Sequence, residues 1–362
     1  MAGHSSGESR LTTAHPAPPA TGEFEPFGRE AREELEAAEL AEGATRSFGA
    51  GNRAREEEPD DFRTCYERDR DRILHSPAFR RLAGKTQVFV FPADHQRTRL
   101  THALEVAQVA TAIARACRLN VALAEAIALG HDCGHGPGGH ASEDALTPFV
   151  LGGFDHAVWG ADVTASPLNL CAETLDGIRN HSWSRPVPAT PEGEVVSLAD
   201  RIAYTAHDLE DAERAGVVRA GDLPDSVVQM CGGTRSHQLR AFVHDVVTTA
   251  AVTGVIGLSE TGGRALADLR EFNYERVYLR PASLEQSQRV VDMLSALVEH
   301  YVCHPSEMPI EYRQSGAATG LAEPANLAVG YVAGMTDRFA CIQAIARLGW
   351  PADRLPRGLD AG

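Results

Sequence analysis

Three histidines and one aspartate lie within ten residues, in the segment HDCGHGPGGH that runs from His131 to His140. Another histidine, His102, lies upstream in RTRLTH. Imidazole and carboxylate groups together suit a divalent first-row metal or Mg²⁺ better than a soft thiolate site would. These residue types and their spacing therefore predict a divalent-metal site.

The elements that carry these residues are predicted to be helices. His102 is expected in the first turn of a helix over 102–119, and His131 and Asp132 in the last turn of the next, apolar helix. Two antiparallel helices with a short connection bring those ends together. A further ligand is expected from Asp200, which follows an apolar run in SLADRIAYTAHDLED. Three or four such ligands leave positions open for water, as catalytic metals require.

Composition restricts the class of protein. The chain has 362 residues, of which 43% are hydrophobic, enough for a sizeable core. It contains no apolar run long enough for a membrane span and no signal-type N-terminus, so no membrane association is expected. Seven cysteines without a C-x-x-C pair indicate reduced thiols in a cytoplasmic protein, not a disulfide framework.

Charge is unevenly distributed along the chain. The net charge of −16 argues against binding long nucleic acids. Between residues 78 and 102, however, the chain has five basic residues and a single acid, Asp94. The basic residues are Arg80, Arg81, Lys85, Arg97 and Arg99. A basic segment beside histidines favours a small polyanionic ligand, with a solvated face as the alternative. Single-stranded nucleic acid is a secondary possibility.

Strand-type alternation is scarce, so the sequence predicts a mainly α fold with one domain. Residues 1–60 are expected to be poorly ordered apart from a short acidic helix at 29–43, and residues 61–350 to form the catalytic domain before a tail at 351–362. The expected helices include one opening at Pro77, one over 102–119, one ending near 134 and one from 140, followed by 168–180, 194–215, 236–268, 283–303 and 325–347. A loop is expected at 152–166, a short strand or turn at 87–91 and another at 274–279.

The ordered set H…HD…D resembles the HD-domain phosphohydrolase superfamily. Longer blocks are similar to its deoxyguanosine triphosphate triphosphohydrolase-like (dNTPase) branch, and they run in order from about residue 62 to 340: HSPAFRRLAGKTQVF, RTRLTHALEVAQVA, EAIALGHDCGHGPGGHASEDAL, LADRIAYTAHDLED, EFNYERVY and AGMTDRFA. The resemblance implies an all-α fold, an HD-domain helical bundle with extra C-terminal helices and little strand.

The resemblance also implies an activity. A deoxynucleoside triphosphate, dGTP or another dNTP, would be hydrolysed at the α-phosphorus to deoxynucleoside and inorganic triphosphate. The metal, held by His102, His131, Asp132 and Asp200, would be Mn²⁺ or Mg²⁺, with Fe²⁺, Ni²⁺ or Zn²⁺ also compatible. The alternative is an HD phosphohydrolase for another nucleotide, such as a 5′-monophosphate. A nucleotide-sensing protein with a vestigial metal site is a third possibility.

Further roles follow from matching motifs. His140 and Glu143 match the family's catalytic pair, which argues against a pure binding protein, and His135 matches an active-site histidine near the phosphates. The i, i+3 spacing would let Glu143 orient the His140 imidazole, which would protonate the leaving 5′ oxygen or handle the attacking water. The expected substrate contacts are Arg99 and Arg201 to phosphate, and Tyr204, Asp208 and Gln87 to the sugar. For Tyr204 core packing is the alternative, and for His140 helix capping.

One departure from the family concerns the glycine-rich loop. The family usually reads GHPPFGH where this chain reads GHGPGGH, with Gly136 and Gly138 in place of a proline and an aromatic residue. We expect this change to loosen the loop and enlarge the pocket. The resemblance further implies a homo-oligomer, a tetramer or a hexamer.

Overall fold

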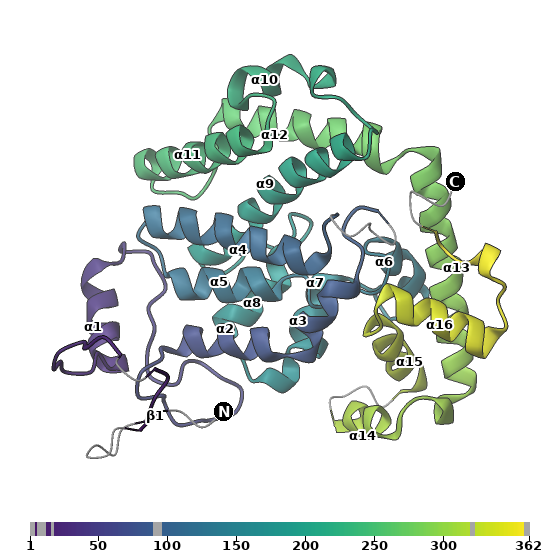
Figure 1. The fold of residues 1–362 in the computed structure, drawn as a ribbon, viewed down its shortest axis with the longest axis horizontal. Coiled ribbons are helices and arrows are strands. Elements are labelled where there is room, and N and C mark those ends of the chain that lie inside the picture. Colours follow the sequence, from purple (N-terminus) through teal and green to yellow (C-terminus); the bar gives the residue numbers. More distant parts are fainter. Residues whose placement is uncertain (1–3, 6–11, 16–17, 90–95, 319–322, 358–362) are drawn as a thin grey trace.

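The computed structural model describes residues 4–5, 12–15, 18–89, 96–318 and 323–357 (Figure 1). The strands in these residues are two short antiparallel segments, β1 (His4–Ser5) and β2 (Thr12–Thr13). Helices make up most of the rest. The predicted all-α fold with little strand is therefore confirmed.

The helices follow one another along the whole described chain. They are α1 (Arg29–Glu39), α2 (Cys65–His75), α3 (Pro77–Arg81), α4 (Arg99–Ala116), α5 (Val121–Gly130), α6 (Ala141–Leu146), α7 (His156–Trp159), α8 (Ala172–Asn180), α9 (Pro191–Arg214), α10 (Asp225–Cys231), α11 (Arg235–Thr253), α12 (Glu260–Asn273), α13 (Pro281–Cys303), α14 (Ile310–Ala318), α15 (Pro324–Ala333) and α16 (Asp337–Leu348). Short 3₁₀ helices lie at Leu82–Gly84, Thr147–Phe149, Ser166–Leu168, Ala220–Asp222, Pro305–Glu307 and Ala352–Arg354, and π-helical turns at Gly160–Thr164 and Tyr274–Tyr278.

The central bundle is formed by α4, α5 and α9, with α2 and α8 packed against α5. Helix α5 is almost entirely apolar and most of its residues are buried, as expected of a helix surrounded by others. It ends at Gly130, where a Cβ atom would lie 2.6 Å from Cδ1 of Ile178 on α8. The glycine therefore allows α8 to approach the end of α5 closely.

Local capping explains where these helices begin. The Asn120 side chain accepts a hydrogen bond from the N–H of Leu123 (3.1 Å) at the start of α5. At α4, the N–H of Thr98 donates to Oγ1 of Thr101 (3.1 Å), so the helix starts at Arg99, three residues earlier than expected. Arg99 and the expected metal ligand His102, which lies one turn later, thus belong to the same helix.

Two further groups of helices flank the bundle (Figure 1). Helices α10, α11 and α12 pack on one another and on α9, at the top of the view. Helices α6, α15 and α16 pack on α13 at the right, around a separate apolar core that includes Leu294, Leu297 and Val329. The expected C-terminal helices are thus present, and the glycine-rich loop lies between the two cores.

Two segments differ from the expectations. Residues 152–166 do not form a plain loop, because the Asp155 carboxylate accepts hydrogen bonds from the N–H groups of Ala157 (2.9 Å) and Val158 (3.3 Å) and thereby caps α7. The expected helix over 236–268 is two helices, since Gly254 takes a φ of +72° and ends α11.

Two other expectations also change. The segment expected to be strand or turn after 273 is a π-helical turn, in which Val277 is buried and the Tyr278 hydroxyl donates to Asp208 (2.5 Å). These tertiary contacts outweigh the β propensity of its aromatic residues.

The expected helix over 325–347 is interrupted before Thr336, which caps α16. Of the short strand or turn expected at 87–91, residues 90–91 lie outside the described residues. Directly before it, Thr86 pairs with Thr98 in an isolated β-bridge.

The N-terminal segment contacts the bundle through polar groups. Helix α1 has no buried residue, but its Glu36 accepts a hydrogen bond from the N–H of Ser47 (2.8 Å). Glu192, in the first turn of α9, accepts hydrogen bonds from the N–H (3.0 Å) and hydroxyl (2.7 Å) of Thr45. The expected domain limits at 60 and 350 stay a prediction. Among the described helices, none combines the length and the apolar character that crossing a membrane would need.

A buried ion pair provides a test of this packing. Asp69 on α2 bonds Arg53 (2.6 Å) and also accepts from the N–H of Cys171 (2.8 Å) and the hydroxyl of Thr174 (2.7 Å). We expect Asp69→Asn to lower the free energy of unfolding by about 3–5 kcal/mol, because the Arg53 charge stays buried without its partner. Asp71→Asn, in a partly exposed pair on the same helix, should cost at most about 1 kcal/mol in urea unfolding. Equal losses would contradict this assignment.

Candidate metal centre and cavity

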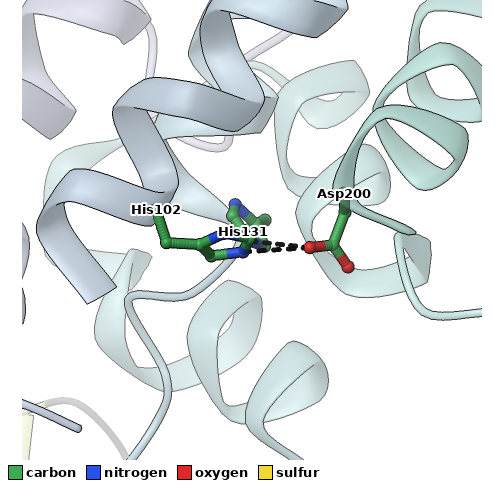
Figure 2. Close-up of side chains that lie close together, drawn as sticks. All are labelled: His102, His131 and Asp200. Carbon is green, nitrogen blue, oxygen red and sulfur yellow. Dashed lines mark hydrogen bonds and ion pairs between the residues drawn. The ribbon is translucent and has the colours of Figure 1, made fainter. Parts of the chain in front are cut away.

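The four predicted metal ligands converge. Nε2 of His102, on α4, lies 3.0 Å from Oδ1 of Asp200, on α9. Nε2 of His131, directly after α5, lies 3.7 Å from the same oxygen and 3.5 Å from Oδ1 of Asp132. Figure 2 shows both imidazoles turned toward the Asp200 carboxylate. The first turn of α4, the end of α5 and the middle of α9 thus bring two imidazoles and two carboxylates close together.

The protonation of His131 indicates what this point accommodates. Its Nδ1 lies 2.6 Å from the carbonyl oxygen of Ala128, which only accepts hydrogen bonds, so Nδ1 carries the proton. Nε2 therefore presents a lone pair, and it is buried without a hydrogen-bond partner. A buried lone pair facing two carboxylates is costly unless a cation lies between them. A ring held through its other nitrogen is also the arrangement that metal-binding histidines have.

The electrostatics of the cluster favour a cation as well. Burial alone would lower the pKa of His102, but the hydrogen bond that His102 donates to Asp200 and the charge of Asp132 leave it raised. Burial would raise the pKa of Asp132, yet the charge of Arg99 holds it well below its usual range. The pKa of Asp200 is lowered against burial as well, mainly by its hydrogen bond with His102. The carboxylates therefore stay ionised, and the residues fit a divalent cation.

The cluster opens into a cavity of about 650 Å³. Arg99 lines this cavity, and its Nη1 lies 2.8 Å from Oδ2 of Asp132. Its Nε is buried and has no hydrogen-bond partner. The guanidinium thus forms an ion pair with Asp132 through Nη1, and its Nε–H remains as a donor for an anion.

The predicted catalytic pair lies at the wall of the cavity. His140 directly precedes α6, and its Nδ1 lies 3.4 Å from Oε2 of Glu143. The His140 side chain is 78% exposed, so its other nitrogen is accessible. Oε1 of Glu143 lies 2.7 Å from Nδ1 of His156. Although burial would raise the pKa of Glu143, the hydrogen bonds of His140 and His156 lower it.

Two histidines near the site were missed by the sequence analysis. Nε2 of His156 lies 3.2 Å from Nε2 of His181, and the ring of His135 stacks on that of His156 with centroids 3.7 Å apart. The His181 ring also contacts that of His131, at 5.0 Å. Each occurs alone in its stretch of sequence, FDHAVW or RNHSW, so no spacing pattern marks it. Only the packing of α7 and α8 brings them to the cluster.

The predicted substrate contacts all line the cavity; these are Gln87, Arg99, Arg201, Tyr204 and Asp208. The Arg201 guanidinium lies 3.5 Å from the centre of the Trp183 ring. The Tyr204 hydroxyl accepts a hydrogen bond from Nε of Arg270 (3.1 Å). The same cavity is lined by four residues for which the sequence indicated no role: Trp183, Arg270, Tyr274 and Tyr278. Core packing therefore does not account for Tyr204 by itself.

The basic segment does not form one surface. Arg97 is neutralised by three carboxylates, those of Glu105 (3.0 Å), Glu210 (2.6 Å) and Asp211 (2.6 Å). Lys85 is buried and donates to backbone carbonyl oxygens. Asp94 lies outside the described residues. Of the five basic residues, Arg99 alone lines the cavity, so these contacts favour a small anion there over a strand of nucleic acid.

The glycine-rich loop is closely packed. Gly138 and Gly139 have φ values of +73° and +65°, and a Cβ at Gly138 would lie 2.4 Å from Cγ1 of Val290. The N–H of Gly136 donates to Oγ of Ser142 (3.1 Å). An aromatic side chain at position 138 would have no space on this backbone, and the expected loosening of the loop stays a prediction.

Loss of a predicted metal ligand should weaken metal binding. We expect His131→Ala to weaken the binding of Mn²⁺ by more than the roughly 10–100-fold that loss of an outer contact costs, because the lone pair itself is removed. Metal content after dialysis, measured by inductively coupled plasma mass spectrometry, tests this. His75→Ala, at an exposed position on α2, is the control. Similar metal content in both variants would contradict the site.

The carboxyl of Asp208 should make stability depend on pH. Burial raises its pKa to about 7 in the folded protein from an ordinary value of 3.8. The folded state then binds the extra proton, and stability falls as pH rises from about 4 to about 7. Asp208→Asn mimics the neutral form, so in metal-free protein it should stabilise more at pH 8 than at pH 5, by about 2 kcal/mol in urea unfolding. Glu271→Gln, at an exposed position, should show no such difference; an equal effect of Asp208→Asn at both pH values would exclude this explanation.

Two protein-family models match the chain. The model described as HD domain matches residues 99–205, which contain all four residues of the metal cluster. The model described as phosphohydrolase-associated domain matches residues 256–344, from just before α12 into α16. The two matches correspond to the central bundle and to most of the C-terminal helices.

Curated relatives match over most of their length. A protein of Caldanaerobacter subterraneus subsp. tengcongensis is 41% identical over 322 residues, which cover 87% of this chain and 94% of the relative. A protein of Clostridium perfringens is 40% identical over 86% of this chain and 94% of the relative. A third, of Desulfatibacillum aliphaticivorans, is 38% identical over 86% and 95%. All three are named deoxyguanosinetriphosphate triphosphohydrolase-like protein. The family expected from the sequence is confirmed: the chain is an HD-domain phosphohydrolase and belongs to the deoxyguanosinetriphosphate triphosphohydrolase-like family.

Proposed function

We propose that this enzyme hydrolyses a deoxynucleoside triphosphate to the deoxynucleoside and inorganic triphosphate. The observation that carries the proposal is the content of one cavity, where the metal cluster, an exposed histidine with its carboxylate, two arginines and a set of polar side chains face one another. The names of the relatives agree with this substrate class.

His102, His131, Asp132 and Asp200 would hold the cation. When bound, a divalent ion polarises a phosphoryl oxygen and makes a bound water more acidic. We propose Mn²⁺ or Mg²⁺, while two imidazoles beside two carboxylates are also compatible with Fe²⁺, Ni²⁺ or Zn²⁺.

The two arginines would bind the phosphates. Arg99 forms an ion pair with Asp132, and Arg201, which follows Asp200 on α9, lines the same cavity. Each has a buried Nε without a hydrogen-bond partner. Unpaired donors of this kind are costly unless a ligand accepts from them, and the flat guanidinium suits phosphate oxygens. Arg99 would contact the α-phosphate and Arg201 the phosphates beyond it.

The sugar would occupy the end of the cavity near Tyr204. Oδ1 of Asp208 and Oε1 of Gln87 are buried acceptors that lack a donor. A deoxyribose hydroxyl would provide one, and the other oxygen of Asp208 is already held by the Tyr278 hydroxyl. This polar end supports a nucleoside rather than an apolar leaving group.

His140 would carry out the proton transfer. Its Nδ1 faces Glu143, which leaves Nε2 for the leaving 5′ oxygen or the attacking water. His135 is less suited to donate a proton, because burial and the charge of Arg99 hold its pKa well below the usual value. A neutral His135 would instead contact the phosphates and support the ring of His156, on which it stacks.

Product analysis tests the proposal. With Mn²⁺ and each of the four dNTPs, we expect ³¹P NMR to show inorganic triphosphate in equal amount to the deoxynucleoside. Attack at the α-phosphorus with the 5′ oxygen leaving requires these products. Release of pyrophosphate and a monophosphate would exclude this reaction. Orthophosphate released only from a panel of 5′-monophosphates would favour the alternative substrate.

A histidine variant identifies the proton-transfer group in the same assay. His140→Ala should lower kcat by about 10²–10⁴-fold while the bound metal is retained. His304→Ala, at an exposed position after α13, is the matched control and should leave kcat unchanged.

A further inference from the structure

The block AGMTDRFA has no part in the proposed chemistry. It lies at the junction of α15 and α16, in the C-terminal group of helices. Its Asp337 is the first residue of α16, is 6% exposed, and does not line the cavity. A buried carboxylate away from the reacting groups needs hydrogen-bond donors, and its donors show what it does.

Both oxygens of Asp337 bind loops that line the cavity. Oδ2 accepts hydrogen bonds from the N–H (2.9 Å) and the hydroxyl (2.5 Å) of Thr86. Oδ1 accepts one from the N–H of Gly138 (2.8 Å). Thr86 precedes Gln87, and Gly138 lies two residues before His140. One carboxylate therefore connects the loop that carries a proposed sugar contact with the loop that carries the proposed acid.

Lys85 makes a second connection across the same gap. Its Nζ donates to the carbonyl oxygens of His135 and of Ala333, at the end of α15 (3.0 Å to Ala333). Its own carbonyl oxygen accepts from the N–H of Arg99 (3.2 Å). The adjacent residues Lys85 and Thr86 thus link the C-terminal helices to the glycine-rich loop and to the start of α4.

We propose that Asp337 is a positioning residue, which holds the His140 and Gln87 loops in register over the metal cluster. Asp337 holds the loop at Gly138, where the backbone takes a left-handed conformation, and Ser142 of α6 holds it at Gly136 and Gly139. The inference rests on the proposed function for its kinetic readout, since it assigns His140 to proton transfer.

The expected effect follows from the geometry of the carboxylate. In Asp337→Asn one acceptor oxygen becomes an NH₂ group, which faces an N–H or a hydroxyl, so at least one of the three hydrogen bonds is lost. A displacement of about 1 Å at a reacting group can cost about 100-fold in rate. We therefore expect kcat to fall by about 100-fold with a much smaller change in KM and unchanged metal content.

Asp245→Asn is the matched control. Asp245 also accepts from a backbone N–H (2.8 Å) and a hydroxyl (2.7 Å) of one residue, Ser259 at the start of α12, but Ser259 does not line the cavity, whereas Thr86 and Gly138 do. The kcat of Asp245→Asn should stay close to that of the parent protein. Equal losses of kcat in the two variants, or unchanged kcat in Asp337→Asn, would overturn the proposal.

A second variant covers the case in which Asp337→Asn does not fold. Thr86→Val keeps the size of the side chain and the backbone N–H, but it removes the hydroxyl that donates to Asp337. It should lower kcat in the same direction by a smaller factor. An unchanged kcat would count against the proposal.

Hydrogen exchange separates this inference from the proposed function. Without substrate, Asp337→Asn should speed exchange of the Thr86 and Gly138 amides, measured by NMR, and leave the amides of α5 as they are. If the parent protein hydrolyses no dNTP, the proposed function fails, and the exchange result still decides whether Asp337 holds the loops. Unchanged exchange at both amides would overturn it.

Discussion

The structure depends on burying two carboxylates and two imidazoles at the point where α4, α5 and α9 meet. Charged groups are costly to bury unless they are paired, and here His131 offers a lone pair while Asp132 and Asp200 stay ionised. A cation at this point would accept the lone pair of His131 and interact favourably with both carboxylates. The apolar packing of α5 supports it, because a tightly packed helix end fixes the direction of the side chains that follow.

The cavity around this cluster is assembled from both apolar cores. The central bundle contributes the cluster and the polar face of α9, and the C-terminal helices reach the cavity through Asp337 and Lys85. The basic segment at 78–102 suggests a basic surface in the sequence. Its Arg97, however, forms ion pairs with three carboxylates within the protein. Arg99 and Asp208, whose Nε and Oδ1 are buried without hydrogen-bond partners, both line the cavity.

Much of this could be predicted from sequence because the signals are local or periodic. The helical fold follows from apolar spacing, and the convergence of His102 with His131 follows from two antiparallel helices with a short connection. The boundaries were less predictable. Thr98 starts α4 early, Asp155 caps a helix inside an expected loop, and Gly254 divides an expected helix, because caps and left-handed residues act at single positions.

The sequence by itself determined the helical class, the family, and the group of histidines and acids that meet at one centre, since residue type and spacing carry that information. Only the tertiary structure decided which other side chains join them. His156, His181 and Tyr278 come from segments without a distinctive pattern, and Asp337 lies 199 residues from the glycine whose N–H it holds. Such contacts depend on how separate helices pack, which no local stretch of sequence records.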